Sequence, residues 1–279
     1  MLPPIARRFV AGETVPVALD HVRARNAEGV NVVLNLLGEH YDRRDRADAD
    51  ADAYCALLDD LDGSGLTACI SVKPTQLGLR VGEEVYRENY RRVVEAAADH
   101  DVFVWSDMEA SETTDATLDA FADLAAEFPG RVGQCVQANL RRTRRDLDRL
   151  ADVPGRVRLV KGAYDEPETI AYTRRAEVTE AFREDLEFCM QELDGTVAVG
   201  THDPALVAEA KSLARRYDRD VEFQMLMGVR EDEQRALAAE GYDVWQYAPY
   251  GRRWLSYFAR RLREREANVA FALRAVVGR

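Results

Sequence analysis

Polar and charged side chains stand at the ends of eight short apolar runs in this chain. In chain order these groups are Glu39 and His40; Lys73, Thr75 and Gln76; Asp107 and Glu109; Gln137 and Asn139; Lys161 and Tyr164; Thr201, His202 and Asp203; Gln224; and Tyr247 and Tyr250. Polar groups at such positions cost desolvation free energy unless a ligand or a partner satisfies them. A salt bridge or a loop hydrogen bond explains any one of them, but eight groups together predict a binding site.

One arginine interrupts an apolar run. Arg158 lies within residues 157–160, and strand alternation places it on the opposite side from Leu159. A charge on the inner side of a sheet is costly unless it is paired. Two interpretations stay open: an internal ion pair, with Asp107 as the partner, or a fixed cation that faces an electron-rich cofactor.

A second group of charges lies near the C-terminus. Tyr257, Arg260, Arg261 and Glu264 are spaced i, i+3, i+4 and i+7, so a helix would present them on one face. Two adjacent guanidinium groups beside an aromatic ring suit the carboxylate of a small, partly apolar substrate. The alternatives are a solvated basic face or a helix that lies on anionic lipid.

The apolar runs alternate with amphipathic segments along most of the chain. This pattern predicts strands at 30–37, 67–72, 102–105, 132–136, 157–160, 197–199, 221–225 and 244–247. It predicts helices at 47–61, 83–98, 115–128, 144–150, 172–193, 205–217, 233–240 and 253–265. Strict alternation favours a parallel sheet covered by helices, and eight units in about 235 residues fit a (β/α)8 TIM-like barrel of the α/β class. In such a barrel the strand-end groups would meet at one rim.

The alternative fold is an open doubly wound sheet, which usually carries a glycine-rich phosphate turn after its first strand. The glycine-rich segment 63–68 precedes a predicted strand instead, so we interpret it as a helix-to-strand turn. We expect a single domain over residues 1–279, with a helical lead-in at 1–29, the barrel at 30–265 and a tail helix at 266–279.

The charged residues are unusually distributed. The 279 residues carry a net charge of −12, with three lysines, 35 arginines and 26 aspartates. An acidic, lysine-poor surface stays hydrated when salt screens charge, so we expect a halophilic protein from a high-salt cytoplasm. The same balance argues against nucleic acid as a partner, since phosphate backbones require a basic surface. Lys73 and Lys161, two of the three lysines, follow predicted strands and are therefore informative.

Cysteine and histidine spacing excludes several other classes. The four cysteines stand far apart without a CxxC pair, which is typical of buried thiols in a reducing cytoplasm, and the four histidines show no metal-ligand spacing. No apolar run is long enough to span a bilayer, and the first residues do not resemble a secretory signal. We therefore expect a cytoplasmic protein without a bound metal.

Several longer motifs point to a known family. They are NLLGEH at 35–40, SVKPTQLGL at 71–79, WSDMEAS at 105–111, VQA at 136–138, RLVKGAY at 158–164, Thr-His-Asp at 201–203 and YAPYGRRWLSYFARRLRER at 247–265. These motifs occur in order over nearly the whole chain, and the chain resembles stand-alone, flavin-dependent proline dehydrogenases. The motifs at 158–164 and 247–265 are the most specific.

The resemblance implies roles for individual residues. Asp107 and Arg158 would be catalytic, with Arg158 near the flavin. The substrate-binding residues would be Lys73, Tyr164, Tyr247 and Tyr257, which line the ring pocket, and Arg260 and Arg261, which hold the carboxylate. The contacts to FAD would be Met108, Gln137, Lys161, Gly162, Ala163, Thr201, His202 and Glu264. Glu39 would pair with Arg260 over the substrate, and this chain departs from the family pattern at Asn139 and Leu255, where tyrosine is common.

The resemblance also implies the reaction: oxidation of L-proline to 1-pyrroline-5-carboxylate by hydride transfer to FAD, as the first step of proline degradation to glutamate. Electrons would pass to a quinone-type acceptor. The arginine-rich end of the chain would then make a peripheral contact with the inner face of the cell membrane, or instead pack on the barrel. The alternatives are a Schiff-base aldolase that uses Lys161, and a protein that binds FAD or proline without turnover.

Overall fold

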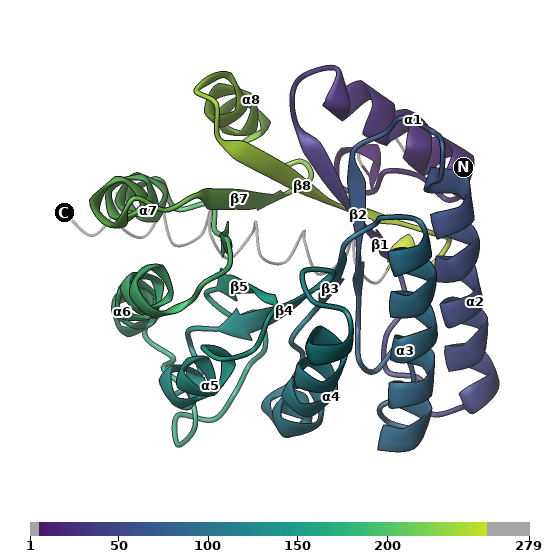
Figure 1. Cartoon of the computed structure of the whole chain (residues 1–279), viewed down its shortest axis with the longest axis horizontal. Coiled ribbons are helices and arrows are strands. Elements are labelled where there is room, and N and C mark those ends of the chain that lie inside the picture. The colour runs from purple at the N-terminus through teal and green to yellow at the C-terminus, as the bar shows by residue number, and fades with distance from the viewer. Residues whose placement is uncertain (1–5, 256–279) are drawn as a thin grey trace, which may run out of the picture.

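Eight parallel strands form a closed barrel in the order β1 to β8, as the alternation predicts (Figure 1). The computed structural model describes residues 6–255. The strands are β1 Asn31–Leu36, β2 Ala68–Val72, β3 Val104–Ser106, β4 Val132–Gln137, β5 Arg156–Val160, β6 Val197–Gly200, β7 Val221–Leu226 and β8 Asp243–Tyr250. The pairing of β1 with β8, from Asn31↔Trp245 to Leu36↔Tyr250, closes the barrel.

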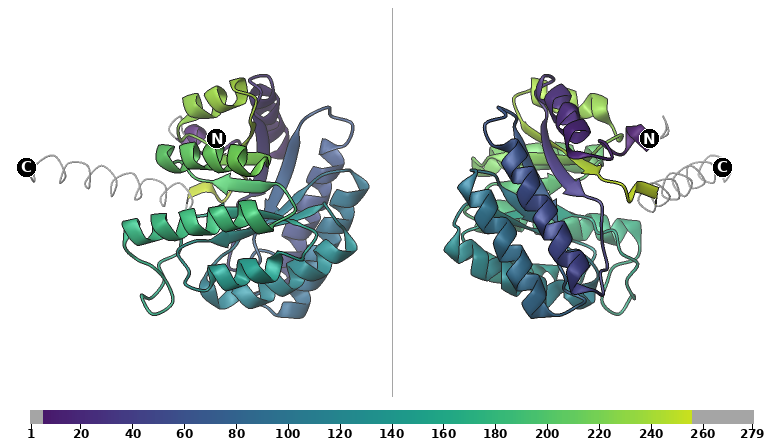
Figure 2. Two further views of the ribbon diagram at one scale, coloured as in Figure 1. Left: turned by 60° about the vertical axis from the view of Figure 1, so that its left-hand side comes forward. Right: turned by 90° about the vertical axis from the view of Figure 1, so that its right-hand side faces the viewer.

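Helices cover the outside of the strands (Figures 1 and 2). They are α1 Val15–Asn26, α2 Arg44–Leu61, α3 Glu83–Asp99, α4 Thr114–Glu127, α5 Thr143–Leu150, α6 Arg175–Glu192, α7 Pro204–Tyr217 and α8 Glu231–Ala239, with short 3-10 turns at Ala6–Arg8 and Ser111–Thr113. The helix predicted at 253–265 lies mostly outside the described residues, and the tail helix at 266–279 lies entirely outside them. The predicted turn at 63–68 is confirmed, since it joins α2 to β2.

Helix α2 begins three residues before its predicted start at 47, and two other predicted boundaries were wrong because of hydrogen bonds to distant backbone. Strand β8 continues three residues beyond the prediction, because the carbonyls of Pro249 and Tyr250 accept hydrogen bonds from the amides of Ala11 and Leu37, both at 2.8 Å. Helix α6 begins three residues later than predicted. The amide of Tyr172 donates to the carbonyl of Asn139 at 2.7 Å, which holds this segment beside the end of β4.

Helix α1 belongs to the covering layer even though it precedes the first strand. Nε2 of His21 on α1 lies 2.7 Å from Oε1 of Gln246 on β8. Just past α1, Glu28 forms an ion pair with Arg235 of α8 at 3.4 Å. The segment before the barrel therefore packs against β1 and reaches β8 through the hydrogen bond of His21 with Gln246.

The barrel has an outer core and an inner core. The outer core packs one face of each strand against the helices and includes Val157 and Leu159 of β5. The inner core contains only strand residues: Val33, Cys69, Trp105 and Ala198. Because Arg158 alternates with Val157 and Leu159, its side chain lies inside the barrel, where the ring of Trp105 is 5.0 Å from the guanidinium carbon.

Candidate active site

The carboxyl ends of the strands surround a cavity of about 1270 Å³. In barrels of this class the functional site lies at this rim. Twelve of the predicted site residues line the cavity: Lys73, Asp107, Met108, Gln137, Arg158, Lys161, Gly162, Ala163, Tyr164, Thr201, His202 and Tyr247. Glu39 lines it too. Four more predicted site residues lie outside the described part of the chain: Tyr257, Arg260, Arg261 and Glu264.

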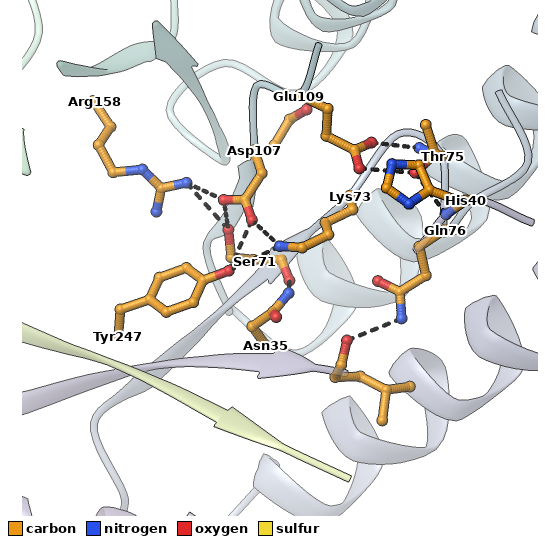
Figure 3. A network of polar contacts seen from close by, with 12 residues as sticks. Asn35, His40, Ser71, Lys73, Thr75, Gln76, Asp107, Glu109, Arg158 and Tyr247 are labelled. Carbon is orange, nitrogen blue, oxygen red and sulfur yellow. Dashed lines mark hydrogen bonds and ion pairs between the residues drawn. The ribbon is translucent and has the colours of Figure 1, made fainter. Parts of the chain in front are cut away.

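Asp107 is the centre of a buried polar cluster (Figure 3). Its Oδ2 accepts hydrogen bonds from Nζ of Lys73 at 2.6 Å and from the Tyr247 hydroxyl at 2.7 Å. Its Oδ1 accepts from the hydroxyl of Ser71 at 2.7 Å and from NH2 of Arg158. The side chains of this cluster come from strands β2, β3, β5 and β8 or from the residues that directly follow them. Closure of the barrel brings these strands around one cavity and so assembles the cluster.

The cluster keeps its charges. Burial alone would raise the pKa of Asp107, but the cations of Lys73 and Arg158 outweigh it and hold the pKa well below its usual range. Burial likewise works against the charge on Lys73, but Asp107 outweighs it, so the pKa of Lys73 is well above normal. At neutral pH the site therefore contains a carboxylate between two cations, and Lys73 is not available as a neutral base or nucleophile.

Arg158 is held from two sides. NH2 donates to Asp107 and NH1 donates to Oε1 of Gln224 at 2.9 Å, and the side chain is 4% exposed. The internal ion pair with Asp107 that the sequence suggested is present. The guanidinium also faces the Tyr247 ring, 5.7 Å from its centroid, so its position is fixed by both charge and packing.

A second carboxylate joins the loops beside this cluster. Oε2 and Oε1 of Glu109 accept from the amide and the hydroxyl of Thr75 at 2.7 and 2.8 Å, and the Thr75 hydroxyl accepts from the amide of His40 at 2.9 Å. Burial raises the pKa of Glu109. The loops after β1, β2 and β3 are therefore tied together at the cavity wall.

The loop after β1, which carries Glu39, is anchored by a partly buried aspartate. Oδ2 of Asp50 on α2 accepts from the Tyr41 hydroxyl at 2.7 Å and from Nε2 of Gln76 at 2.8 Å. Burial raises the pKa of Asp50 to about 6. A Cβ on Gly38 would lie 2.3 Å from the Tyr41 hydroxyl and 2.6 Å from Oδ2 of Asp50, so this close contact requires glycine.

Another part of the cavity carries donors for an anion. Nζ of Lys161 lies 3.0 Å from Oδ2 of Asp203 and 3.1 Å from the Thr179 hydroxyl, and Arg175 at the start of α6 lines the same cavity. Gly162 has φ +109°, and a Cβ there would lie 2.0 Å from Oδ1 of Asn139. The backbone can take this turn only with glycine, which leaves room beside Lys161.

Other predicted residues are held by the fold as well as facing the cavity. Gln137 donates from Nε2 to the carbonyl of Glu109 at 2.9 Å and accepts from the amide of Ala163 at 3.3 Å. Nε2 of His202 accepts from the amide of Leu226 at 2.8 Å. Since this nitrogen accepts, the ring proton lies on Nδ1.

Several polar residues that line the cavity received no role from the sequence, among them Arg175, Gln224 and Asp203. Asp203 and Gln224 stood in the strand-end groups but were given no role. Arg175 was placed inside a helix predicted from residue 172, whereas it is the first residue of α6. Its position just after the loop from β5 is the signal that could have identified it.

Residues 6–255 contain neither a metal-binding cluster nor a membrane-spanning helix. No group of three or more His, Cys, Asp or Glu side chains there is arranged to hold a metal ion. No helix in that range is long and apolar enough to cross a membrane.

Comparisons with known proteins agree with this arrangement. The model of the proline dehydrogenase family matches residues 18–274. Proline dehydrogenase of Deinococcus radiodurans is 37% identical to the chain, and proline dehydrogenase 1 of Bacillus subtilis is 34% identical; in each case the match covers 98% of this chain and 90% of the relative. Among solved structures, proline utilization A from Bdellovibrio bacteriovorus, crystallised after inactivation by N-propargylglycine, matches with a TM-score of 0.85 and 25% identity.

That match covers 92% of this chain but 32% of the longer Bdellovibrio protein. The chain therefore corresponds in length to the stand-alone relatives and not to the longer bifunctional ones. A family match over most of the chain, together with two relatives of similar length above 30% identity, shows that this chain belongs to the proline dehydrogenase family of enzymes.

Proposed function

We propose that this enzyme oxidises L-proline to 1-pyrroline-5-carboxylate with FAD as its cofactor, in the first step of proline degradation to glutamate. The observation that carries the proposal is the cluster of Asp107, Lys73, Arg158 and Tyr247 at the mouth of a barrel of the proline dehydrogenase family.

The residues of the cavity fit FAD. Lys161 and Arg175 offer cationic donors suited to a diphosphate, and Thr201 and His202 add polar groups to the same cavity. Met108, Val160 and Leu226 supply apolar surface for a flat ring system. The volume of about 1270 Å³ exceeds the roughly 300–1,000 Å³ of pockets for drug-sized ligands, which leaves room for a dinucleotide together with a small substrate.

When bound, FAD would supply the isoalloxazine ring that accepts the hydride from the proline carbon beside nitrogen. The protein's contribution is placement and electrostatics. Arg158, fixed by Asp107 and Gln224, provides a stationary positive charge at the inner end of the cavity. Lys73, Tyr164 and Tyr247 line the same wall and exclude water from the proline ring.

The substrate carboxylate requires its own cations, because Lys73 and Arg158 are already paired with Asp107. The resemblance assigns this role to Arg260 and Arg261, with Tyr257 beside them and Glu264 toward FAD. Bidentate binding of the carboxylate would fix where the reacting carbon lies.

The aldolase alternative requires a neutral amine on Lys161. That amine instead donates to the Asp203 carboxylate at 3.0 Å and to the Thr179 hydroxyl at 3.1 Å, so it is already engaged by the fold. We therefore retain the dehydrogenase as the proposed function.

The proposed electron acceptor is a quinone, and the arginine-rich end of the chain remains the candidate for peripheral contact with the membrane. Anaerobically reduced enzyme should be reoxidised by a water-soluble quinone. Sedimentation with anionic vesicles, with and without residues 256–279, tests the membrane contact separately.

Anaerobic titration tests the central proposal. Purified enzyme loaded with FAD should lose its flavin absorbance on addition of L-proline, and 1-pyrroline-5-carboxylate should appear in equal amount. N-propargylglycine should inactivate the enzyme, and excess L-proline should protect it. The proposal is contradicted if the protein takes up no FAD. It is also contradicted if the bound flavin stays oxidised after L-proline is added.

A further inference from the structure

A line of hydrogen bonds runs from the active-site cluster into the closed interior of the barrel. NH1 of Arg158 donates to Oε1 of Gln224 at 2.9 Å, and Nε2 of Gln224 donates to Oε1 of Glu222 at 2.5 Å. Glu222 and Gln224 are two residues apart on β7, so both side chains point to the same side of the strand. A carboxylate one layer below the cavity is thereby connected to the cavity.

The stability of the fold does not account for this carboxylate. Glu222 is 1% exposed, and its ion-pair partner Arg156 lies 3.6 Å away, too far for a hydrogen bond. The Arg156 side chain is 38% exposed and also faces the ring of Phe103. A poorly paired buried carboxylate carries a desolvation cost that a glutamine of the same shape would not incur.

A carboxylate does one thing here that an amide would not do. The Gln224 side chain can present either oxygen or nitrogen to Arg158, but a guanidinium has only donors and requires the oxygen. An ionised Glu222 only accepts hydrogen bonds, so the nitrogen of Gln224 must face it and the oxygen must face Arg158. Glutamine at position 222 would accept or donate equally well and would leave the orientation of Gln224 open.

We propose that Glu222 is a positioning residue for proline oxidation: it fixes the side-chain amide of Gln224, which holds Arg158 from the side opposite Asp107. This inference rests on the proposed function, in which Arg158 is a catalytic residue near the flavin. Glu222 itself does not line the cavity, so it acts only through Gln224.

The protonation of Glu222 provides a way to examine this role. The groups that face it are Arg156 and Arg158 of β5, Asp243 of β8, Cys69 of β2 and Gln224 on its own strand. Burial raises the pKa of Glu222 to about 7. Below that pH the acid can donate as well as accept, so the wild-type enzyme should then behave like the E222Q variant.

The primary experiment compares E222Q with the control D243N in FAD-loaded enzyme. Asp243 pairs in register with Glu222, but it is exposed and accepts from Asn31 at 2.9 Å, outside the line to Arg158. For E222Q, kcat should fall by about tenfold at about pH 8, with KM changed by less than about twofold. The ratio of wild-type to E222Q kcat, in which titration of the proline amine cancels, should approach one below about pH 6. D243N should match the wild-type kcat at about pH 8, where Glu222 is ionised in both proteins.

A double-mutant cycle separates orientation from the electric field of the carboxylate. In a Q224M background E222Q should cause no further loss, because there is no amide to orient. If E222Q still lowers kcat there, or if E222Q alone changes nothing, the inference is wrong. Should E222Q fail to fold, Q224M must itself show the tenfold loss, and an unchanged Q224M would overturn the proposal.

A readout independent of turnover completes the test. The signals of the Arg158 guanidinium are observed in nitrogen-15 spectra of protein without FAD and are assigned by their loss in the Arg158→Lys variant. These protons should be protected from exchange with solvent in the wild type and should exchange faster in E222Q. Equal exchange in both would contradict the inference. Failure of wild-type flavin to respond to proline would instead contradict the proposed function, so the two failures are distinguishable.

Discussion

The ammonium of Lys73 and the carboxylate of Asp107 are 2.6 Å apart and only 13% and 14% exposed, although 34 residues separate them in the chain. The same carboxylate also binds Arg158, so one anion offsets two cations inside the barrel. Removing any member leaves a buried charge without its partner, and that is costly. The site therefore depends on all three residues together.

Replacement of Lys73 tests this dependence directly. In K73M, Asp107 keeps Arg158 but loses the cation beside Tyr247, and kcat/KM for proline should fall by about a hundredfold or more, as expected when one member of a buried charge pair is removed. The matched control is K211M, since Lys211 pairs with Glu240 on the outer surface. Steady-state kinetics of both variants should show a loss in K73M alone.

Replacement of Arg260 or Arg261 tests carboxylate recognition. Either change to alanine should raise KM for proline by the equivalent of about 2–4 kcal/mol, with a smaller effect on kcat. Arg263, which falls off the predicted face, is the control. An unchanged KM in both R260A and R261A would show that another cation holds the carboxylate.

Gly162 should be essential for cofactor binding. G162A would force a side chain into φ +109° and against Asn139, so the loop beside Lys161 must move. We expect FAD affinity to fall by about tenfold or more, measured from flavin retained after gel filtration. Gly65 also has positive φ, but nothing lies within 4 Å of a Cβ there, so G65A should cost about 1 kcal/mol of stability and retain FAD.

The anchor at Asp50 should make stability depend on pH. Its pKa is raised to about 6, so the folded state binds a proton that the unfolded chain releases near pH 4. Wild-type stability therefore loses this contribution as the pH rises from about 4 to above 6. D50N has no carboxyl at this position and does not lose this contribution. The free energy of unfolding of D50N minus that of the wild type should therefore increase by about 1–2 kcal/mol from pH 4 to pH 8.

Urea unfolding at several pH values measures this difference. Asp52 provides the control, because it lies on the same helix, is exposed and pairs with Arg92. A D52N variant that reproduces the trend would show that general charge effects, not the Asp50 anchor, are responsible.

Salt should stabilise the enzyme if the composition reflects a high-salt cytoplasm. Ion pairs join neighbouring helices, for example Arg87 with Asp123 and Arg183 with Glu209, but exposed pairs contribute only about 0–1 kcal/mol each. Repulsion from the net charge of −12 should dominate, and salt screens it. The thermal midpoint should therefore rise with KCl, and a midpoint that falls would contradict the halophilic interpretation.

The sequence by itself determined the fold class and identified twelve of the residues that line the cavity. Apolar runs at regular spacing specify strands and helices locally, and a parallel barrel brings all strand ends to one rim. Arg158 could be placed inside the barrel because alternation along a strand is a local property. A pair with Asp107 was one of two interpretations of its charge, and the structure shows that pair.

Only the tertiary structure decided which atoms meet. Asp107 binds Ser71 of β2 and Tyr247 of β8 as well as Arg158, and Glu222 reaches Arg158 through Gln224; of these contacts the sequence suggested only the pair of Asp107 with Arg158. The start of α6 and the end of β8 differ from the prediction for the same reason, since Tyr172 and Pro249 are held by hydrogen bonds to distant backbone. The physical reason is that hydrogen bonds require separations near 3 Å and suitable angles, and closure of the barrel sets these for residues far apart in the chain.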